Sequence, residues 1–203
     1  MIIFTNGCQR ALESNMKIIF ILFILIFHFL SAEEYDVDKS ANNKVKFISD
    51  APIESFEGVT DQIDGYLYHE GDSLTTKSQL YFVVDLNSLD TGIGLRNRHM
   101  RDNYLQTDKY PTTYYKGKII KAVKVDADSI NIISEGTIFI HGVEKPLKVE
   151  AELFHKEDRY HIQCSFNVKL SDFNIEIPSI MFYKINENMD LQLDFYIKLF
   201  KKN

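Results

Sequence analysis

The sequence predicts an all-β fold, an antiparallel β-barrel of about eight strands with one short helix at one end. Most of the chain alternates apolar and polar residues with a period of two, the pattern of strands that bury one face. Two late segments, 159–170 and 189–200, keep this alternation for more than ten residues. Long strands with apolar residues on one face favour closure into a barrel, because closure removes exposed strand edges.

The two late segments define the clearest inward faces. The face of the first carries Tyr160, Ile162, Cys164, Phe166, Val168 and Leu170, and that of the second carries Leu191, Leu193, Phe195, Ile197 and Leu199. Further strands are expected at 44–48, 62–70, 78–86, 112–125, 129–134, 136–142 and 145–155. Gly117 indicates a bulge inside one of them, and Glu135-Gly136 a tight turn between two.

One stretch, residues 89–111, departs from the strand pattern. Asp90 and Thr91 are both residue types that begin helices, and Pro111 cannot extend one. A helix is therefore expected from about Leu95 to Leu105, with apolar contacts on one side and Arg and His on the other.

The N-terminus reads as a targeting segment rather than as part of the fold. Residues 17–32, KIIFILFILIFHFLSA, have the lysine, apolar run and small terminal residues of a secretory signal peptide. The run is shorter than the ~20 residues that a membrane-spanning helix needs, so no permanent span is expected in the mature chain. The expected organisation is 1–15 as an over-long gene start, 16–32 as the signal peptide, 33–43 as a flexible lead-in and 44–203 as the barrel. A periplasmic or secreted location follows, with cleavage near Ala32.

Composition and motif searches narrow the functional classes. The formal net charge is −6, and an acidic exported protein is a poor nucleic-acid binder, because phosphate contacts need a basic surface. The histidines lack metal-site spacing, so no metal is expected. No nucleophile elbow or phosphate-binding glycine loop is present, so no catalytic residue and no cofactor are assigned. Cys164, on an apolar face, is expected to be a buried inert thiol.

Several separated blocks resemble the YceI-like family. They are FISDAPIESFEGVTDQIDGYLY, VVDLNSLDTG with TGIGLRNRHMRDNYLQTDKYP, GTIFIHGVEKPLKVEAEL and LSDFNIEIPSI, in this order and across nearly the whole mature domain. The resemblance implies an elongated, lipocalin-like barrel in the periplasm with a hydrophobic tunnel. It also implies a long amphiphilic ligand, such as a polyisoprenoid, an isoprenoid quinone or a fatty-acid derivative, bound for carriage, storage or sensing.

The inward apolar residues either pack a core or line such a tunnel. Core packing is the default for an arbitrary barrel, whereas the resemblance favours the tunnel. The expected lining consists of Phe82, Val84, Leu147, Val149, Ala151, Ile162, Cys164, Phe166, Leu191, Leu193, Phe195 and Ile197.

The Arg and His residues of the helix have two possible roles. Arg96, His99 and Arg101 can bind a ligand head group at the barrel mouth. Alternatively the arginines pair with Asp90, Asp102 or Asp108 and fix the helix, which is the favoured reading because arginines near several aspartates usually form surface pairs.

Three functional classes follow. The first is a lipid-binding barrel, the second an interaction module with a side-chain-filled core that binds a partner protein, and the third an enzyme with His99 as acid or base. The first is preferred. The identity of the ligand, and the choice between monomer and homodimer, stay open.

Overall fold

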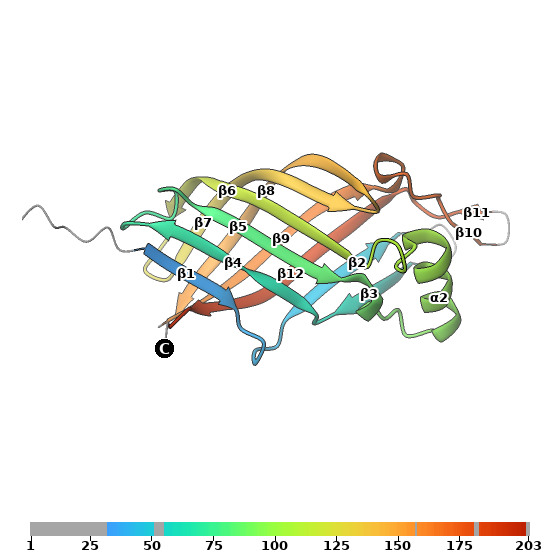
Figure 1. The fold of residues 1–203 in the computed structure, drawn as a ribbon, viewed down its shortest axis with the longest axis horizontal. Helices are drawn as coiled ribbons and strands as arrows, with labels where there is room; N and C mark the ends of the chain where they lie inside the picture. Colours follow the sequence, from blue (N-terminus) through green and yellow to red (C-terminus); the bar gives the residue numbers. More distant parts are fainter. Residues whose placement is uncertain (1–31, 51–54, 157, 181–182, 202–203) are drawn as a thin grey trace, which may run out of the picture. The chain divides into compact units, whose positions relative to one another are not determined.

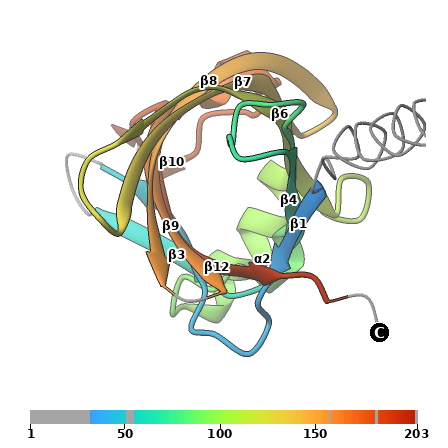
Figure 2. The same ribbon diagram turned by 90° about the vertical axis from the view of Figure 1, so that its left-hand side faces the viewer.

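Eight strands close into an antiparallel barrel within the part of the chain that the computed structural model describes, residues 32–50, 55–156, 158–180 and 183–201. Figures 1 and 2 show the strands side by side and as a ring, in the order β1-β4-β5-β6-β7-β8-β9-β12, with β12 pairing back to β1. Their bounds are β1 Ala32–Val37, β4 Ile63–Glu70, β5 Gln79–Asp85, β6 Thr112–Lys124, β7 Ser129–Ile140, β8 Val143–Lys156, β9 Arg159–Lys169 and β12 Asn188–Leu199. The expected all-β barrel with a short helix at one end is confirmed.

Two strand pairs lie outside this ring. β2 (Lys44–Ser49) and β3 (Phe56–Thr60) form a hairpin that continues the sheet beyond the first half of β12. β10 (Ser179–Ile180) and β11 (Tyr183–Lys184) pair with each other.

The expectation of a flexible lead-in at 33–43 is wrong, because β1 completes the barrel there between β4 and β12. Tyr35 and Val37 are buried. The turn that follows is fixed to β12: the Asp38 N–H donates to the Tyr196 carbonyl oxygen at 2.8 Å, and the Asn43 side-chain oxygen accepts the Tyr196 N–H at 3.0 Å. These bonds satisfy the backbone of β12 where it changes partner from β2 to β1.

The expected turn at Glu135-Gly136 is also wrong, since β7 runs unbroken from Ser129 to Ile140. Gly136 faces Gly117 on β6. A Cβ atom on Gly136 would lie 2.2 Å from the Lys116 carbonyl oxygen, so this glycine permits a close approach of two strands rather than a turn.

The bulge expected at Gly117 lies instead between Ile119 and Lys121. Ile119 is 2% exposed, and its backbone N–H and carbonyl both bond the Ser78 hydroxyl, at 2.8 and 3.3 Å. The bulge therefore lies where the Ser78 hydroxyl forms hydrogen bonds with the backbone of Ile119.

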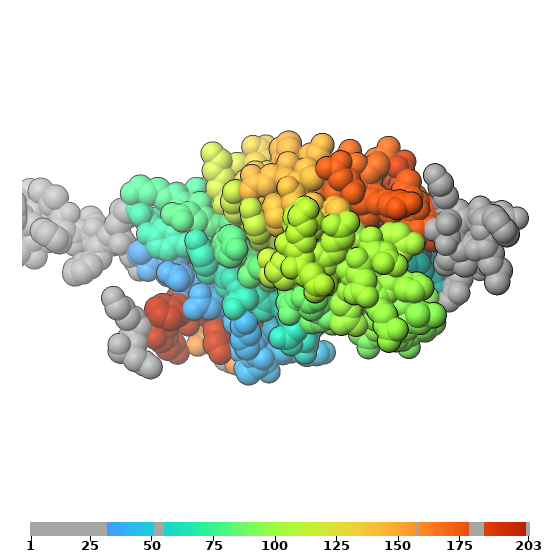
Figure 3. All heavy atoms as spheres, turned by 45° about the vertical axis from the view of Figure 1, so that its right-hand side comes forward, coloured from blue at the N-terminus to red at the C-terminus, as the bar shows by residue number. Residues whose placement is uncertain are grey.

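A continuous helical segment closes one end of the barrel. α2 (Gly94–His99) passes directly into the π-helical turn η2 (Met100–Leu105), so the expected helix is present. The short 3-10 turns η1 (Leu86–Ser88) and η3 (Leu170–Phe173) lie before it and after β9. Figure 3 shows the helical segment, in green, packed over the barrel strands.

No helix in the described ranges is long and apolar enough to cross a membrane. The upstream segment expected at 1–15 and residues 16–31 of the signal peptide expected at 16–32 lie outside the described residues, so both stay predictions.

Candidate functional site

An apolar cavity of about 410 Å³ lies beneath the helical segment. Its walls come from the strand ends nearest the helix and from the chain between β9 and β12. Representative lining residues are Phe47, Thr113, Ile140, Val168, Met189 and Leu191. The volume is at the lower end of the ~300–1,000 Å³ found for small-molecule pockets.

The other half of the barrel interior is filled by side chains. A core cluster there includes Ile63, Leu67, Leu153 and Ile197, each at most 1% exposed. The cavity thus occupies one end of the barrel interior, and a packed core occupies the other.

The structure divides the expected lining residues between these two regions. Leu191 lines the cavity, and Leu147 and Phe166 pack in a second cluster beside it. The residues that pack in or against the main core are Phe82, Val84, Ala151, Ile162, Leu193, Phe195 and Ile197. Val149 is buried. Burial raises the pKa of the Cys164 thiol to about 12, so this cysteine is protonated at neutral pH.

Some residues that line the cavity were not among the expected lining residues, and only part of them lie in segments with a regular sequence pattern. Val168 and Leu170 lie on an inward face that the two-residue period had identified. Phe173 and Ile175 also line the cavity, but they belong to LSDFNIEIP, which has no regular period. Only the fold could place them inside.

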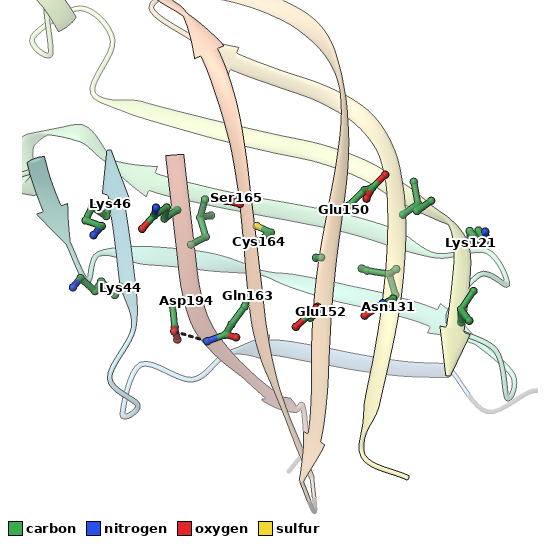
Figure 4. A pocket seen from close by; sticks show the side chains of 16 residues that line it. Lys44, Lys46, Lys121, Asn131, Glu150, Glu152, Gln163, Cys164, Ser165 and Asp194 are labelled. Atoms are coloured by element: carbon green, nitrogen blue, oxygen red, sulfur yellow. Dashed lines mark hydrogen bonds between the residues drawn. The ribbon is translucent and has the colours of Figure 1, made fainter. Parts of the chain in front are cut away.

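The barrel wall beside the cavity is split between β8 and β9. These strands pair only from Ala151 opposite Cys164 to Lys156 opposite Arg159. Beyond this point, among the described residues, β8 pairs with β7 and β9 with β12. In Figure 4 the strand that carries Glu150 diverges from the one that carries Ser165.

The segment after β9 fills this split. Phe173 and Ile175 are 4% and 5% exposed and pack with the inward residues of β7, β8 and β9. The His141 Nδ1 lies 3.0 Å from the Phe173 carbonyl oxygen and fixes the segment to the β7–β8 turn. We call residues Leu170–Ile175 the plug.

Pro146 suits this arrangement. It lies opposite Thr137, in the fourth residue pair from the His141-Gly142 turn. The alternation of antiparallel hydrogen bonds points its nitrogen away from β7 and toward the split. A residue without an N–H donor is tolerated there because, in the described part of the chain, no strand pairs with β8 on that side.

The cavity mouth combines exposed apolar side chains with an arginine and a histidine. Ile93 and Leu95 line the cavity and are 50% and 59% exposed. Arg96 and His99 also line it, whereas Arg101 is absent from the wall. Two of the three expected head-group residues therefore lie at the mouth.

The two arginines contact the chain before the helix. Arg96 donates to the Thr91 hydroxyl at 3.0 Å and to its carbonyl at 2.7 Å, and its guanidinium lies 4.6 Å from the centre of the Phe56 ring. Arg101 donates to the carbonyl oxygens of Asn97 and Asn87. Arg96 thus bonds Thr91, and Arg101 bonds Asn87 and Asn97, where pairing with Asp90, Asp102 or Asp108 was expected.

Asn97 anchors the helix and was not identified from the sequence. Its side-chain oxygen accepts from the Thr91 N–H at 2.8 Å and from the Thr91 hydroxyl at 2.6 Å, and its amide donates to Asp90 Oδ1 at 2.7 Å. Asp90 and Thr91, expected at the helix start, thus bond Asn97, while Ile93 occupies the N-cap without a side-chain hydrogen bond.

A larger depression of about 900 Å³ lies on the outer face of the sheet, over the point where β8 and β9 part (Figure 4). Its charged residues are Lys44, Lys46 and Lys121 against Glu150, Glu152 and Asp194. Equal numbers of opposite charges give no net attraction for a charged ligand, and the depression is open to solvent. The apolar cavity is therefore the better candidate site.

Metal binding finds no support in the residues that the structure describes, where no group of three His, Cys, Asp or Glu side chains could hold an ion.

Comparison with known proteins places these features in a family. The model of the YceI-like domain matches residues 35–197. The protein YceI of Shigella flexneri is 28% identical over 155 residues, which cover 71% of this chain and 78% of that protein. Protein YceI of Salmonella newport is 29% identical over 154 residues, with 71% and 77% covered.

Solved structures share the fold at lower identity. BcnA of Burkholderia cenocepacia has a TM-score of 0.65 at 15% identity, covering 79% of this chain and 98% of BcnA. A polyisoprenoid binding domain from Saccharophagus degradans has a TM-score of 0.62 at 18% identity, covering 81% of this chain and 97% of that domain. With the family model matching most of the sequence, this chain belongs to the YceI-like family.

Proposed function

We propose that the protein binds the hydrocarbon chain of an amphiphile in the apolar cavity and holds its head group at the mouth beside Arg96 and His99. The observation that carries the proposal is the apolar cavity under the helix, open to solvent past Ile93 and Leu95. Removal of apolar surface from water contributes about 25 cal/mol per Å², so a buried chain binds without specific polar contacts in the interior.

The composition of the wall favours binding over catalysis. Among the described lining residues, the titratable ones are Arg96, His99 and Tyr104. A wall without carboxylates or a thiol lacks the nucleophile and acid–base pair that lipid hydrolysis or transfer commonly uses. His99 is exposed, and among the described residues no carboxylate forms a hydrogen bond or an ion pair with it.

The relatives support the same proposal. The S. degradans domain is a polyisoprenoid binding domain, and it shares the fold over 81% of this chain. We extend a lipid ligand to this protein on that likeness, and we place the protein in the periplasm or outside the cell on the signal peptide expected at 16–32. Carriage, storage and sensing are equally compatible with a single enclosed chain.

Filling the cavity tests the proposal. Val168 lines it, and Asn167, the next residue on β9, is exposed on the outer face. Val168→Trp should abolish uptake of a fluorescent fatty-acyl probe, and Asn167→Trp should leave it unchanged. Native mass spectrometry of the wild-type protein should also show a bound amphiphile. An empty wild-type chain that takes up no acyl or prenyl probe would refute the proposal.

A further inference from the structure

We infer that Tyr115 closes the barrel interior directly behind the inner end of the cavity and limits the ligand to one hydrocarbon chain of about 15 carbons. At roughly 30 Å³ for each water-sized group, the 410 Å³ cavity holds on the order of 15 methylene groups. The inference rests on the proposed function and adds to it a length limit and the residue that sets it.

The position of Tyr115 follows from the register of β6. Tyr115 lies opposite Phe82 on β5 and Ile138 on β7, both inward residues. Thr113, two residues nearer the helix on the same face, lines the cavity, and Tyr115 does not. On β7, Ile140 lines the cavity and Ile138, two residues deeper, is buried at 6% exposure. The cavity therefore ends at the same depth in the barrel on β6 and on β7.

Tyr115 also joins the two packed regions. It contacts the main core on one side and the cluster of Ile138, Ile140, Phe173 and Ile175 on the other. Beyond it the interior is closed, since the rings of Phe82 and Phe195 meet edge to face with centroids 5.0 Å apart. A longer chain would therefore have to displace the Tyr115 ring before it met further space.

Hydrogen bonds hold the ring in place. The Tyr115 hydroxyl donates to Ser134 Oγ at 3.0 Å, and Ser134, 3% exposed, lies 3.4 Å from the Val149 carbonyl oxygen. The ring lies over Gly117, where a Cβ atom would come within 2.8 Å of the Tyr115 oxygen. A buried hydroxyl that loses its partner is costly, so the ring resists displacement by a hydrocarbon chain.

The experiment measures affinity against chain length with saturated fatty acids from about 8 to about 24 carbons. Each buried methylene should raise affinity about fourfold until the cavity is full, and the rise should stop near 15 carbons. Tyr115→Ala should move this break to longer chains by several carbons. Tyr115→Phe, which keeps the ring but removes its hydrogen bond to Ser134, should move the break by fewer carbons than Tyr115→Ala does. Tyr114→Ala, which removes a tyrosine from the outer face of the same strand, should leave the break where it is.

The outcomes separate the length limit from the proposed function. Affinity that keeps rising beyond about 20 carbons in the wild-type protein, or a break that does not move in folded Tyr115→Ala, would overturn the limit alone. If Tyr115→Ala fails to fold, Tyr115→Leu provides the shorter side chain with the core kept apolar. A wild-type protein that binds no acid of any length would instead overturn the proposed function.

Discussion

Asp38 Oδ1 accepts a 2.9 Å hydrogen bond from Lys198 Nζ across the seam where β1 meets β12. The same oxygen accepts from the backbone and hydroxyl of Ser40, and Arg159 lies 3.3 Å from Oδ2. Asp38 is fully buried, yet these donors outweigh burial and lower its pKa to about 2. A carboxylate held in this way contributes to stability only while it is ionised.

The pKa of Asp38 predicts an acid-dependent loss of stability. Its folded pKa of about 2 lies below the ordinary aspartate value of 3.8, so the contribution is complete above pH 4 and is lost as the pH falls from about 4 to about 2. We expect about 1 kcal/mol, because Lys198 and Arg159 are half exposed and screened. Asp38→Asn should lower the unfolding free energy in urea at pH 7 and flatten its dependence on pH below 4.

Asp64 supplies the control for this measurement. It pairs with Lys39 at 2.7 Å, but both side chains are about 60% exposed. Asp64→Asn should therefore change stability by less than Asp38→Asn does. Equal effects of the two substitutions would show that the β1–β12 seam does not depend on the buried carboxylate.

Asn97 should control the order of the helix that covers the cavity. Asn97→Asp keeps the shape but replaces the amide donor by an oxygen 2.7 Å from Asp90 Oδ1, which places two carboxylates together above pH 5. We expect a loss of about 2 kcal/mol and faster hydrogen exchange across 94–105. Asn103→Asp, in the exposed part of the same helical segment, should have little effect. Unchanged exchange in Asn97→Asp would contradict this anchoring role.

Substitutions of His99 and Arg101 should separate the role of head-group binding from the role of supporting the helix. His99 lines the cavity mouth and is exposed, so His99→Ala should leave stability unchanged and weaken binding of an anionic amphiphile two- to fivefold, as expected for about 0.5–1 kcal/mol from an exposed charge pair.

Arg101→Gln should show the opposite result. Its guanidinium bonds the carbonyls of Asn97 and Asn87 and does not line the cavity, so stability should fall while affinity per folded molecule is kept. Titration calorimetry with a fatty acid and with its uncharged alcohol tests both variants. A loss for the alcohol as large as for the acid in His99→Ala would exclude a role for charge.

The barrel was predictable because its long strands alternate so regularly. β9 and β12 lie within one residue of the expected ranges, since each buries one face along its whole length. β1 was missed because three of its six residues are acidic, which conceals the buried Tyr35 and Val37. Its outer Asp36 lies opposite Lys198, a pairing that only the closed barrel shows.

The division between core and cavity could not be read from the strand pattern. Phe195 and Leu191 share the inward face of β12, yet Phe195 is 2% exposed in the core and Leu191 lines the cavity. A period of two gives the side of the sheet but not the distance along the barrel. That distance depends on how the plug and the helix fill one end of the barrel. Both are held by hydrogen bonds of residues outside the strands, where the sequence has no period of two.

Phe173 tests the plug that fills the split between β8 and β9. It is 4% exposed and packs against inward residues of the neighbouring strands, so Phe173→Ala should cost about 3–5 kcal/mol of unfolding free energy. Hydrogen exchange should rise selectively in 143–150 and 165–169, because the facing edges of these strands do not pair with each other among the described residues and the plug lies between them. Phe154→Ala removes the same ring from the outer face, where it is half buried beside His161, and should cost less and leave those amides protected. If both variants lose equal stability and 143–150 stays protected in Phe173→Ala, the barrel wall is held at the split by something other than the plug.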